Sequence, residues 1–250
     1  MKSTQIEGRN PVLEALKSGR PIERLLIAEG QRHGSINKII ALARAQGVDI
    51  RMVSQTELEN LATTCSHQGV LAVVAEKEYL DLEQLLDEAF ARSAQPLILV
   101  LDRIEDPHNL GALIRSAEAV GAAGVVIPKR RAVGLTATVA KTAAGALEYV
   151  SVARVTNLVQ ALEAMKRRGF WIVGSDAAAK QYCYDVDLTG PIGLVIGSEG
   201  QGMKRLVAES CDFLVRLPML GQVSSLNASV AGGVLLFEAV RQRLGSERTE

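Results

Sequence analysis

Four uninterrupted apolar segments in the second half of the chain constrain its fold more than any other feature. They are Leu97–Leu101, Gly124–Ile127, Phe170–Val173 and Ile192–Ile196. Strands of this kind are buried on both faces, which is typical of a mainly parallel sheet covered by helices. A shorter apolar strand, Phe213–Leu217, precedes the last helix. The pattern predicts an α/β domain. The helices expected between the strands are Leu110–Val120, Ala137–Ala144 and Leu158–Arg168.

The first 75 residues show a separate alternation of short helices and strands, which predicts a small α/β domain. In the acidic segment 76–95 that follows, six carboxylate side chains stand against two basic ones, and apolar residues recur at helical spacing. We therefore expect a linker helix between domains 1–75 and 96–250. The elements expected in the first domain are helices Pro11–Lys17, Ile36–Gln46 and Thr56–Leu61 and strands Leu25–Ala28, Asp49–Val53 and Val70–Ala75.

The composition excludes several classes of protein. The formal net charge is zero, which argues against indiscriminate coating of nucleic acid but allows a local basic patch. The three cysteines and three histidines are scattered without a C-x-x-C pair, so neither disulfides nor a metal site is expected. No apolar run reaches the roughly 18 residues of a membrane span, and the N-terminus lacks a signal-peptide core. We therefore expect a cytoplasmic protein that does not contact membranes.

Polar residues that follow the strand Leu97–Leu101 form the first candidate site. The turn from Asp106 to Asn109 begins the next helix, and Asn109 is a suitable N-cap. Arg115 lies about a turn and a half into this helix, among small apolar residues. That position is within reach of the carboxyl edge of the sheet, where open α/β sheets bind ligands. A surface arginine explains Arg115 equally well on this evidence.

A glycine-rich loop, 197–202, follows the strand Ile192–Ile196 and forms the second candidate site. Glycines after a buried strand let the backbone approach a ligand closely. The loop is not a G-x-G-x-x-G fingerprint and lies on a late strand, which argues against a nicotinamide dehydrogenase. Glu199 within it would repel phosphate. A ligand with positive charge or hydrogen-bond donors therefore fits better.

The third candidate site follows the strand Phe213–Leu217, which Pro218 ends. A loop containing Gly221 leads to a long helix that is expected to open at Ser224, Ser225 and Asn227. Capping needs fewer such residues, so a plain capped helix and a ligand site both stay open. The basic run 129–131 is open in the same way, since it could contact a phosphate backbone or form a solvated loop.

The three sites together resemble the signature motifs of a known enzyme family. They read D-P-x-N-x-G-x-x-x-R-S-A, G-x-E-x-x-G-M and P-M-x-G-x-x-x-S-L-N. In order, spacing and type they resemble the SpoU (TrmH-like) 2′-O-ribose RNA methyltransferases of the SPOUT class, over residues 96–245. The front domain and linker resemble the RlmB-like subgroup, whose members methylate a guanosine of 23S ribosomal RNA and carry an L30e-like RNA-binding domain.

The resemblance implies a catalytic domain with a deep C-terminal trefoil knot that binds S-adenosyl-L-methionine. The catalytic positions it implies are Asn109, Arg115, Glu199, Ser225 and Asn227. The cofactor-binding positions it implies are Gly197, Leu217, Leu226, Met219 and Gly221. The implied partners are 23S ribosomal RNA, or another structured RNA, and a second copy of the chain. In such a homodimer the active site takes residues from both subunits. Neither DNA nor a metal ion is expected.

The implied reaction is an in-line attack of a ribose 2′-oxygen on the sulfonium methyl group. The family mechanism makes Arg115 the proton acceptor, but a guanidinium has a pKa above about 12 and rarely loses its proton. We therefore prefer that Arg115 binds the 3′-phosphate and stabilises alkoxide charge. Transfer-RNA ribose methylation and non-catalytic RNA binding are the alternative functions. Because only 4% of the residues are aromatic, contacts to RNA shape and phosphate are expected to outweigh base stacking.

Overall fold

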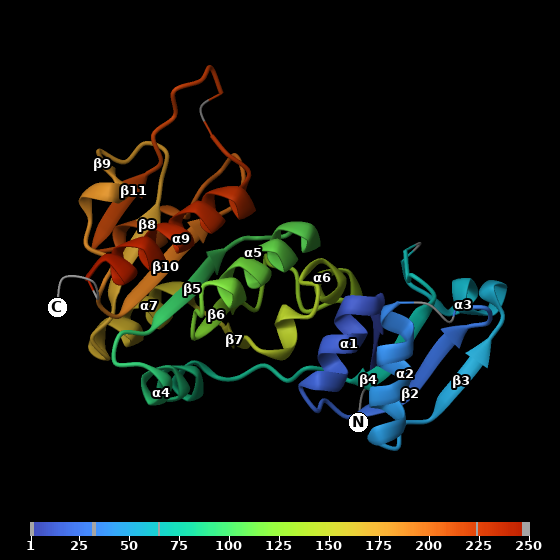
Figure 1. The fold of residues 1–250 in the computed structure, drawn as a ribbon. Coiled ribbons are helices and arrows are strands. Elements are labelled where there is room, and N and C mark those ends of the chain that lie inside the picture. The colour runs from blue at the N-terminus through green and yellow to red at the C-terminus, as the bar shows by residue number, and fades with distance from the viewer. Residues whose placement is uncertain (1–2, 32–33, 65, 224, 247–250) are drawn as a thin grey trace. The chain divides into compact units, whose positions relative to one another are not determined.

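The computed structural model describes residues 3–31, 34–64, 66–223 and 225–246. The chain divides into two compact units, the first made of residues 1–78 and 134–149 and the second of residues 79–133 and 150–250. Figure 1 shows the helices and strands of each unit. Among the described residues, no helix is both long and apolar enough to cross a membrane.

The first unit is a four-stranded mixed sheet with helices packed against it. Its strand order is β1-β4-β2-β3, with β4 antiparallel to both neighbours and β3 parallel to β2. The strands are β1 (Ser3–Glu7), β2 (Ile22–Ala28), β3 (Ile50–Val53) and β4 (Val70–Ala75). The helices are α1 (Arg9–Lys17), α2 (Ser35–Ala45), α3 (Gln55–Leu61), α6 (Ala137–Thr142) and the 3-10 helix η1 (Ala146–Glu148). Strand β1 was not predicted, because its first three residues are polar.

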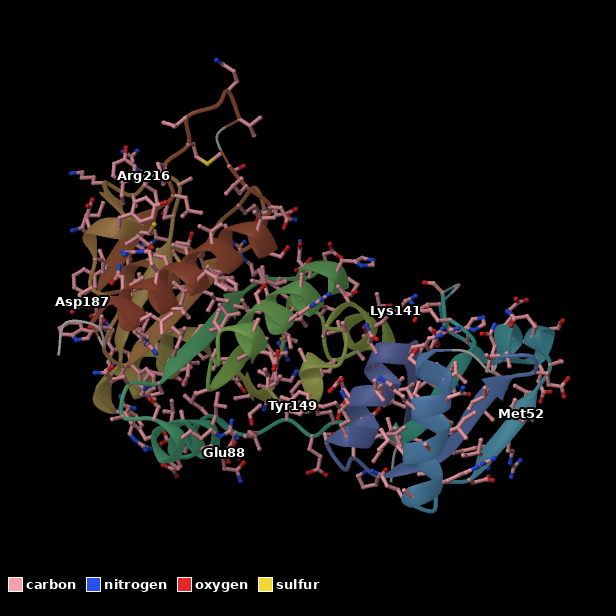
Figure 2. All side chains as sticks on the ribbon, viewed as in Figure 1. Met52, Glu88, Lys141, Tyr149, Asp187 and Arg216 are labelled. Carbon is pink, nitrogen blue, oxygen red and sulfur yellow. The ribbon has the colours of Figure 1, made fainter. Side chains whose placement is uncertain are left out.

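Residues 134–149 belong to the first unit although they follow strands of the second. Glu148 Oε1 accepts a hydrogen bond from Arg20 Nη1 at 2.7 Å. Lys141, labelled in Figure 2, donates from Nζ to Thr64 Oγ1 at 2.9 Å. This grouping differs from the continuous domains 1–75 and 96–250 that the sequence predicts. Contacts between residues more than 70 positions apart determine it, and local periodicity carries no signal of such contacts.

The second unit contains a seven-stranded sheet in which all the paired strands are parallel, as the apolar segments predict. The strand order is β7-β6-β5-β10-β8-β11-β9. The strands are β5 (Leu97–Asp102), β6 (Gly124–Pro128), β7 (Ser151–Val155), β8 (Trp171–Ser175), β9 (Gln181–Tyr182), β10 (Ile192–Gly197) and β11 (Phe213–Arg216). Strands β5, β6 and β10 are buried along their whole length. The parallel α/β architecture is therefore confirmed.

Helices cover both faces of this sheet (Figure 1). They are α4 (Leu82–Arg92), α5 (Pro107–Ala119), α7 (Leu158–Arg167), α8 (Arg205–Glu209) and α9 (Ala228–Ser246), with the 3-10 helix η2 (Cys183–Asp185). Helices α4 and α7 pack on one face, where Leu85 and Met165 are fully buried. Helix α4, in the segment expected to be a linker, thus packs within this unit. Helices α5 and α9 pack together on the other face. Gly232 of α9 allows this close packing, because a Cβ there would lie 2.4 Å from Leu113 Cδ2.

The central strands β5 and β10 end beside each other, with Asp102 paired to Gly197. Because parallel strands run in one direction, the loops that follow β5, β8, β10 and β11 leave from the same edge of the sheet. After β11 the chain runs outward in a long loop and returns at Ala228 to form α9 (Figure 1). Arg216 lies at the base of this loop (Figure 2). This edge therefore brings together segments far apart in the sequence.

Candidate active site

Three side chains from three different loops meet at this edge of the sheet. Asn109 Nδ2 donates a hydrogen bond to Glu199 Oε1 at 3.2 Å. Asn227 Nδ2 donates to Asn109 Oδ1 at 2.9 Å and also to Glu199 Oε1. The backbone N–H of Ala228 donates to the same carboxylate oxygen at 3.2 Å. Glu199 is therefore held by donors from the other two motifs, which explains an acidic residue in a glycine loop.

Asn227 also caps the start of α9. Its Oδ1 accepts hydrogen bonds from the N–H groups of Ser229 at 2.9 Å and Val230 at 3.2 Å, which is the geometry of an N-cap. The helix therefore begins at Ala228, and Ser225 remains in the preceding loop. The expectation that Ser225 opens the helix is wrong, because Glu199 accepts from the N–H of Ala228 and Asn227 accepts from the next two N–H groups. Ser224 lies outside the described residues.

The end of β10 leaves no room for a side chain at Gly197, and the loop that follows turns at two glycines with positive φ. A Cβ at Gly197 would lie 2.2 Å from the carbonyl carbon of Gly202 and 2.3 Å from the backbone nitrogen of Met203. Gly200 and Gly202 have φ values of +76° and +61°, a region that glycine adopts without strain. The backbones of Ser198 and Gly202 exchange two hydrogen bonds that close the loop. This tight loop fixes the position of Glu199.

A cavity of about 660 Å³ lies among this loop, the loop after β11 and the start of α9. Its wall combines apolar side chains, backbone groups and a few charged groups, a mixture typical of small-molecule sites. The apolar side chains include Ile196, Met203, Leu217, Met219 and Leu226, and the charged ones are Asp176, Glu199 and Arg216. Apolar surface suits an adenine ring, and carboxylates suit ribose hydroxyls, an ammonium group and a sulfonium. The residues present therefore fit S-adenosylmethionine.

Four of the five implied cofactor positions line this cavity, namely Gly197, Leu217, Met219 and Leu226. Gly221 does not line it and is exposed, and no described atom lies within 4 Å of a Cβ built on it. Ser225, expected among the catalytic residues, lines the cofactor cavity. Asp176 and Arg216 were not identified from the sequence, because they follow β8 and end β11 outside any of the three motifs.

A second cavity, of about 390 Å³, shares Ser198, Glu199 and Gln201 with the first. The rest of its wall is mostly charged and comes from the ends of β5 and β6 and the start of α5. These residues are Arg103, Ile104, Glu105, Asp106, Asn109 and Arg131. Glu199 therefore borders both cavities, and the hydrogen-bonded cluster joins their walls.

Two charged residues at the end of β5 support the glycine loop. Arg103 has φ +62° and donates from Nη1 to Gln201 Oε1 at 2.7 Å and from Nη2 to the Gly202 carbonyl at 2.9 Å. Asp102 is 1% exposed, and its Oδ2 accepts a hydrogen bond from the Lys204 N–H at 2.7 Å. The sequence draws attention to Asp102 and Arg103, since two charged residues directly follow an apolar run. It does not show which groups they bind.

Arg115 was expected to be catalytic, but within a single chain it does not join the hydrogen-bonded cluster of Asn109, Glu199 and Asn227. Its side chain is exposed on α5 and lines neither cavity. Within the described part of the chain, no hydrogen bond or ion pair involves its guanidinium. Its neighbour Ser116 faces α9, where a Cβ at Gly233 would lie 3.6 Å from Ser116 Oγ. Arg115 is therefore an exposed residue of the helix that packs against α9.

Two family models match the chain. One, described as the SpoU rRNA Methylase family, matches residues 96–237. The other, described as RNA 2'-O ribose methyltransferase substrate binding, matches residues 5–80. The first match contains the three polar loops and both cavities, and the second contains most of the four-stranded unit.

Relatives and solved structures agree with these matches. A Bacillus subtilis protein, YacO, named for the TrmH family of tRNA/rRNA methyltransferases, is 53% identical over 236 residues, 94% of each chain. The SpoU methyltransferase AviRb from Streptomyces viridochromogenes, in complex with AdoMet, is 28% identical with a TM-score of 0.80 over 97% of this chain and 91% of its own. An AdoMet-bound rRNA methyltransferase from Sinorhizobium meliloti is 26% identical with a TM-score of 0.79 over 96% of this chain and 87% of its own.

A tRNA-modifying TrmH/SpoU enzyme from A. aeolicus matches less of the chain. It is 32% identical with a TM-score of 0.56 and covers 66% of this chain and 84% of its own. The solved structures thus differ in whether they match almost the whole chain or about two thirds of it.

Proposed function

Because the chain belongs to the SpoU rRNA methylase family and is thus an S-adenosylmethionine-dependent RNA 2′-O-ribose methyltransferase, we propose that its substrate is a guanosine in 23S ribosomal RNA. The observation that carries this proposal is the front unit. Residues 5–80 match a substrate-binding family model, and the rRNA methyltransferase from S. meliloti covers 96% of the chain. The tRNA-modifying enzyme from A. aeolicus covers only 66%. The rRNA methyltransferase thus matches the front unit as well as the rest of the chain, which favours ribosomal RNA over transfer RNA as the substrate.

The two cavities suggest how the catalytic residues divide the work. When bound, S-adenosylmethionine supplies a methyl group on a positively charged sulfur and leaves as a thioether. The chain must align a ribose 2′-oxygen with that methyl group, and alignment of two bound reactants contributes much of the rate in such reactions. Glu199, held by Asn109 and Asn227, borders both cavities, so we assign this cluster to the ribose hydroxyls. We assign Ser225 to the cofactor side.

We further propose a homodimer formed through α9. Four apolar side chains recur along its exposed side at intervals of four, three and seven residues, which places them on one helix face. They are Val230, Val234, Phe237 and Leu244, each between 41% and 55% exposed. Arg115 is exposed on α5, the helix that packs against α9, and lacks a partner among the described residues of its own chain. A second subunit packed here would place Arg115 near its partner's site, where it would bind the RNA phosphate.

Replacing Phe237 by aspartate is expected to convert the dimer into monomers, because a buried, unpaired carboxylate at an interface costs several kcal/mol. Light scattering after size-exclusion chromatography would show the mass fall by half. Met52→Asp is the matched control, since Met52 is 45% exposed on β3 in the first unit (Figure 2). A wild-type chain that is monomeric at micromolar concentration would contradict the proposed dimer.

We also propose that the second unit contains a trefoil knot and that the protein acts in the cytoplasm. The loops after β10 and β11 lie against the start of α9, which is the part of the chain where the resemblance places the knot. Knotted chains are otherwise nearly absent among proteins.

Mapping ribose methylation in total RNA, with and without the gene, tests the substrate. We expect one guanosine of 23S ribosomal RNA to lose its 2′-O-methyl group when the gene is deleted, and purified protein to restore it. Loss confined to a transfer RNA would establish the alternative substrate. If no nucleotide changes and calorimetry detects no binding of S-adenosylmethionine, the chain is a non-catalytic RNA-binding protein and the proposal fails.

A further inference from the structure

The second cavity combines features of a nucleotide site. It shares three residues with the cofactor cavity, so a molecule held in it lies next to a molecule held in the first. Its wall offers the carboxamide of Asn109 and the carboxylates of Glu105 and Glu199, which can accept hydrogen bonds from hydroxyl groups. It also offers the guanidinium groups of Arg103 and Arg131, which suit a phosphate.

The two arginines in this wall differ in what they already bind. Arg103 donates two hydrogen bonds to the glycine loop, and its side chain is 16% exposed. Arg131 is exposed, and among the described residues no group accepts a hydrogen bond from its side chain. Its five N–H donors therefore remain available to a ligand. Arg130, the preceding residue, is also exposed but does not line the cavity.

The backbone conformation at Arg131 supports a role for this side chain in ligand binding. Arg131 has φ +57°, one of four described non-glycine residues with positive φ, and Arg103 in the same wall is another. Such a conformation costs an arginine about 1–3 kcal/mol and persists where the surroundings require it. Glycine would adopt it without strain. Arg103 uses its side chain to hold the glycine loop, whereas no contact among the described residues gives the Arg131 side chain a structural role.

We propose that this cavity binds the nucleotide that carries the target ribose, with the Arg131 guanidinium on its phosphate. The inference rests on the proposed function and names the RNA side of the same site. Free phosphate would face the carboxylates of Glu105, Asp106 and Glu199, which would repel it. A ribonucleotide matches the wall better, because its hydroxyl groups donate to the carboxylates and its phosphate accepts from Arg131. Arg131 thus becomes a substrate-binding residue that the three motifs do not contain.

The experiment compares Arg131→Gln with Arg130→Gln in the full-length protein. Both changes remove one charge from the same basic run, so general attraction to RNA would fall equally. We expect Arg131→Gln to raise the KM for RNA at least about tenfold and Arg130→Gln to raise it less than about twofold. Calorimetry should give both variants the wild-type affinity for S-adenosylmethionine. Arg131→Lys is expected to recover only part of the loss, because lysine cannot pair bidentately with phosphate.

Arg131→Gly separates this role from a structural one. The substitution removes the side chain and relieves the strained backbone, so we expect a melting temperature equal to or above wild type together with the raised KM. Equal effects of the Arg130 and Arg131 variants on KM would overturn the inference, as would loss of S-adenosylmethionine binding in Arg131→Gln. If wild-type protein transfers no methyl group to any RNA, the proposed function itself fails, an outcome distinct from either of these.

Discussion

Replacing Gly197 by alanine is expected to weaken the binding of S-adenosylmethionine by at least about 100-fold, or about 2.8 kcal/mol. The added Cβ would lie 2.2 Å from the carbonyl carbon of Gly202, far inside van der Waals contact. Backbone atoms cannot rotate away as a flexible side chain can, so the whole loop must move. That loop forms part of the wall of the cofactor cavity and carries Glu199. Isothermal titration calorimetry measures the affinity directly.

Gly193→Ala on the same strand is the matched control. A Cβ there would also make contacts that are too close, 2.7 Å from Met165 Cε and 2.8 Å from Ile172 Cδ1. These atoms are the ends of flexible side chains in the core, so the protein should lose about 1–3 kcal/mol of stability without changing the cofactor cavity. Both variants should melt at lower temperature, but only Gly197→Ala should lose affinity. Wild-type affinity in Gly197→Ala would show that the cavity is not the cofactor site.

The parallel sheet was predictable because each of its central strands β5 and β10 contains at least five consecutive apolar residues. Strands β5 and β10 are buried on both faces, which leaves an unbroken apolar run in the sequence. Strand β9 has only two residues, both exposed, and carries no such signal. Strand β7 mixes buried and partly exposed positions, since Ser151 and Arg154 interrupt its apolar residues. Edge strands of this kind are recognisable only from their partners.

The placement of polar residues at strand ends was predictable in the same way. The positions of Asn109, Glu199 and Asn227 follow from the direction of parallel strands, although the motifs alone could not show that one carboxylate oxygen joins them. Arg103 was not identified, because its role depends on a left-handed backbone and on two acceptors about 100 residues away. Residues that act by supporting a loop have no motif of their own.

Replacing Arg115 by alanine is expected to lower kcat for methyl transfer by about 10²–10³-fold, the usual effect of removing one donor to a developing oxyanion. Because Arg115 lines neither cavity in its own chain, the affinity for S-adenosylmethionine should not change. Arg205→Ala, which removes an exposed arginine from α8, is the control and should keep wild-type activity. Full activity in Arg115→Ala would exclude both roles considered for this residue.

Arg115→Lys distinguishes phosphate binding from proton transfer. A lysine that accepts the hydroxyl proton must first lose its own, with a pKa near 10.4, so the rate would rise steeply toward high pH. A lysine that binds phosphate stays charged, and the variant would keep the pH profile of the wild type at reduced rate. We expect the second result, measured as kcat between pH 6 and pH 10 by transfer of labelled methyl groups. This range lies below the lysine pKa, where a lysine base would make kcat rise about tenfold per pH unit.

Mixing two inactive variants tests whether Arg115 serves the partner's site. In a dimer of one Arg115→Ala chain and one Gly197→Ala chain, a site acting in trans combines an intact cofactor cavity from the first with an intact arginine from the second. Equal mixing gives half heterodimers with one complete site each, so about a quarter of wild-type activity should return. If Arg115 acts within its own chain, every site carries a defect and no activity returns. Asn227→Ala can replace Gly197→Ala as the second chain, because it damages the same side of the site without a backbone clash.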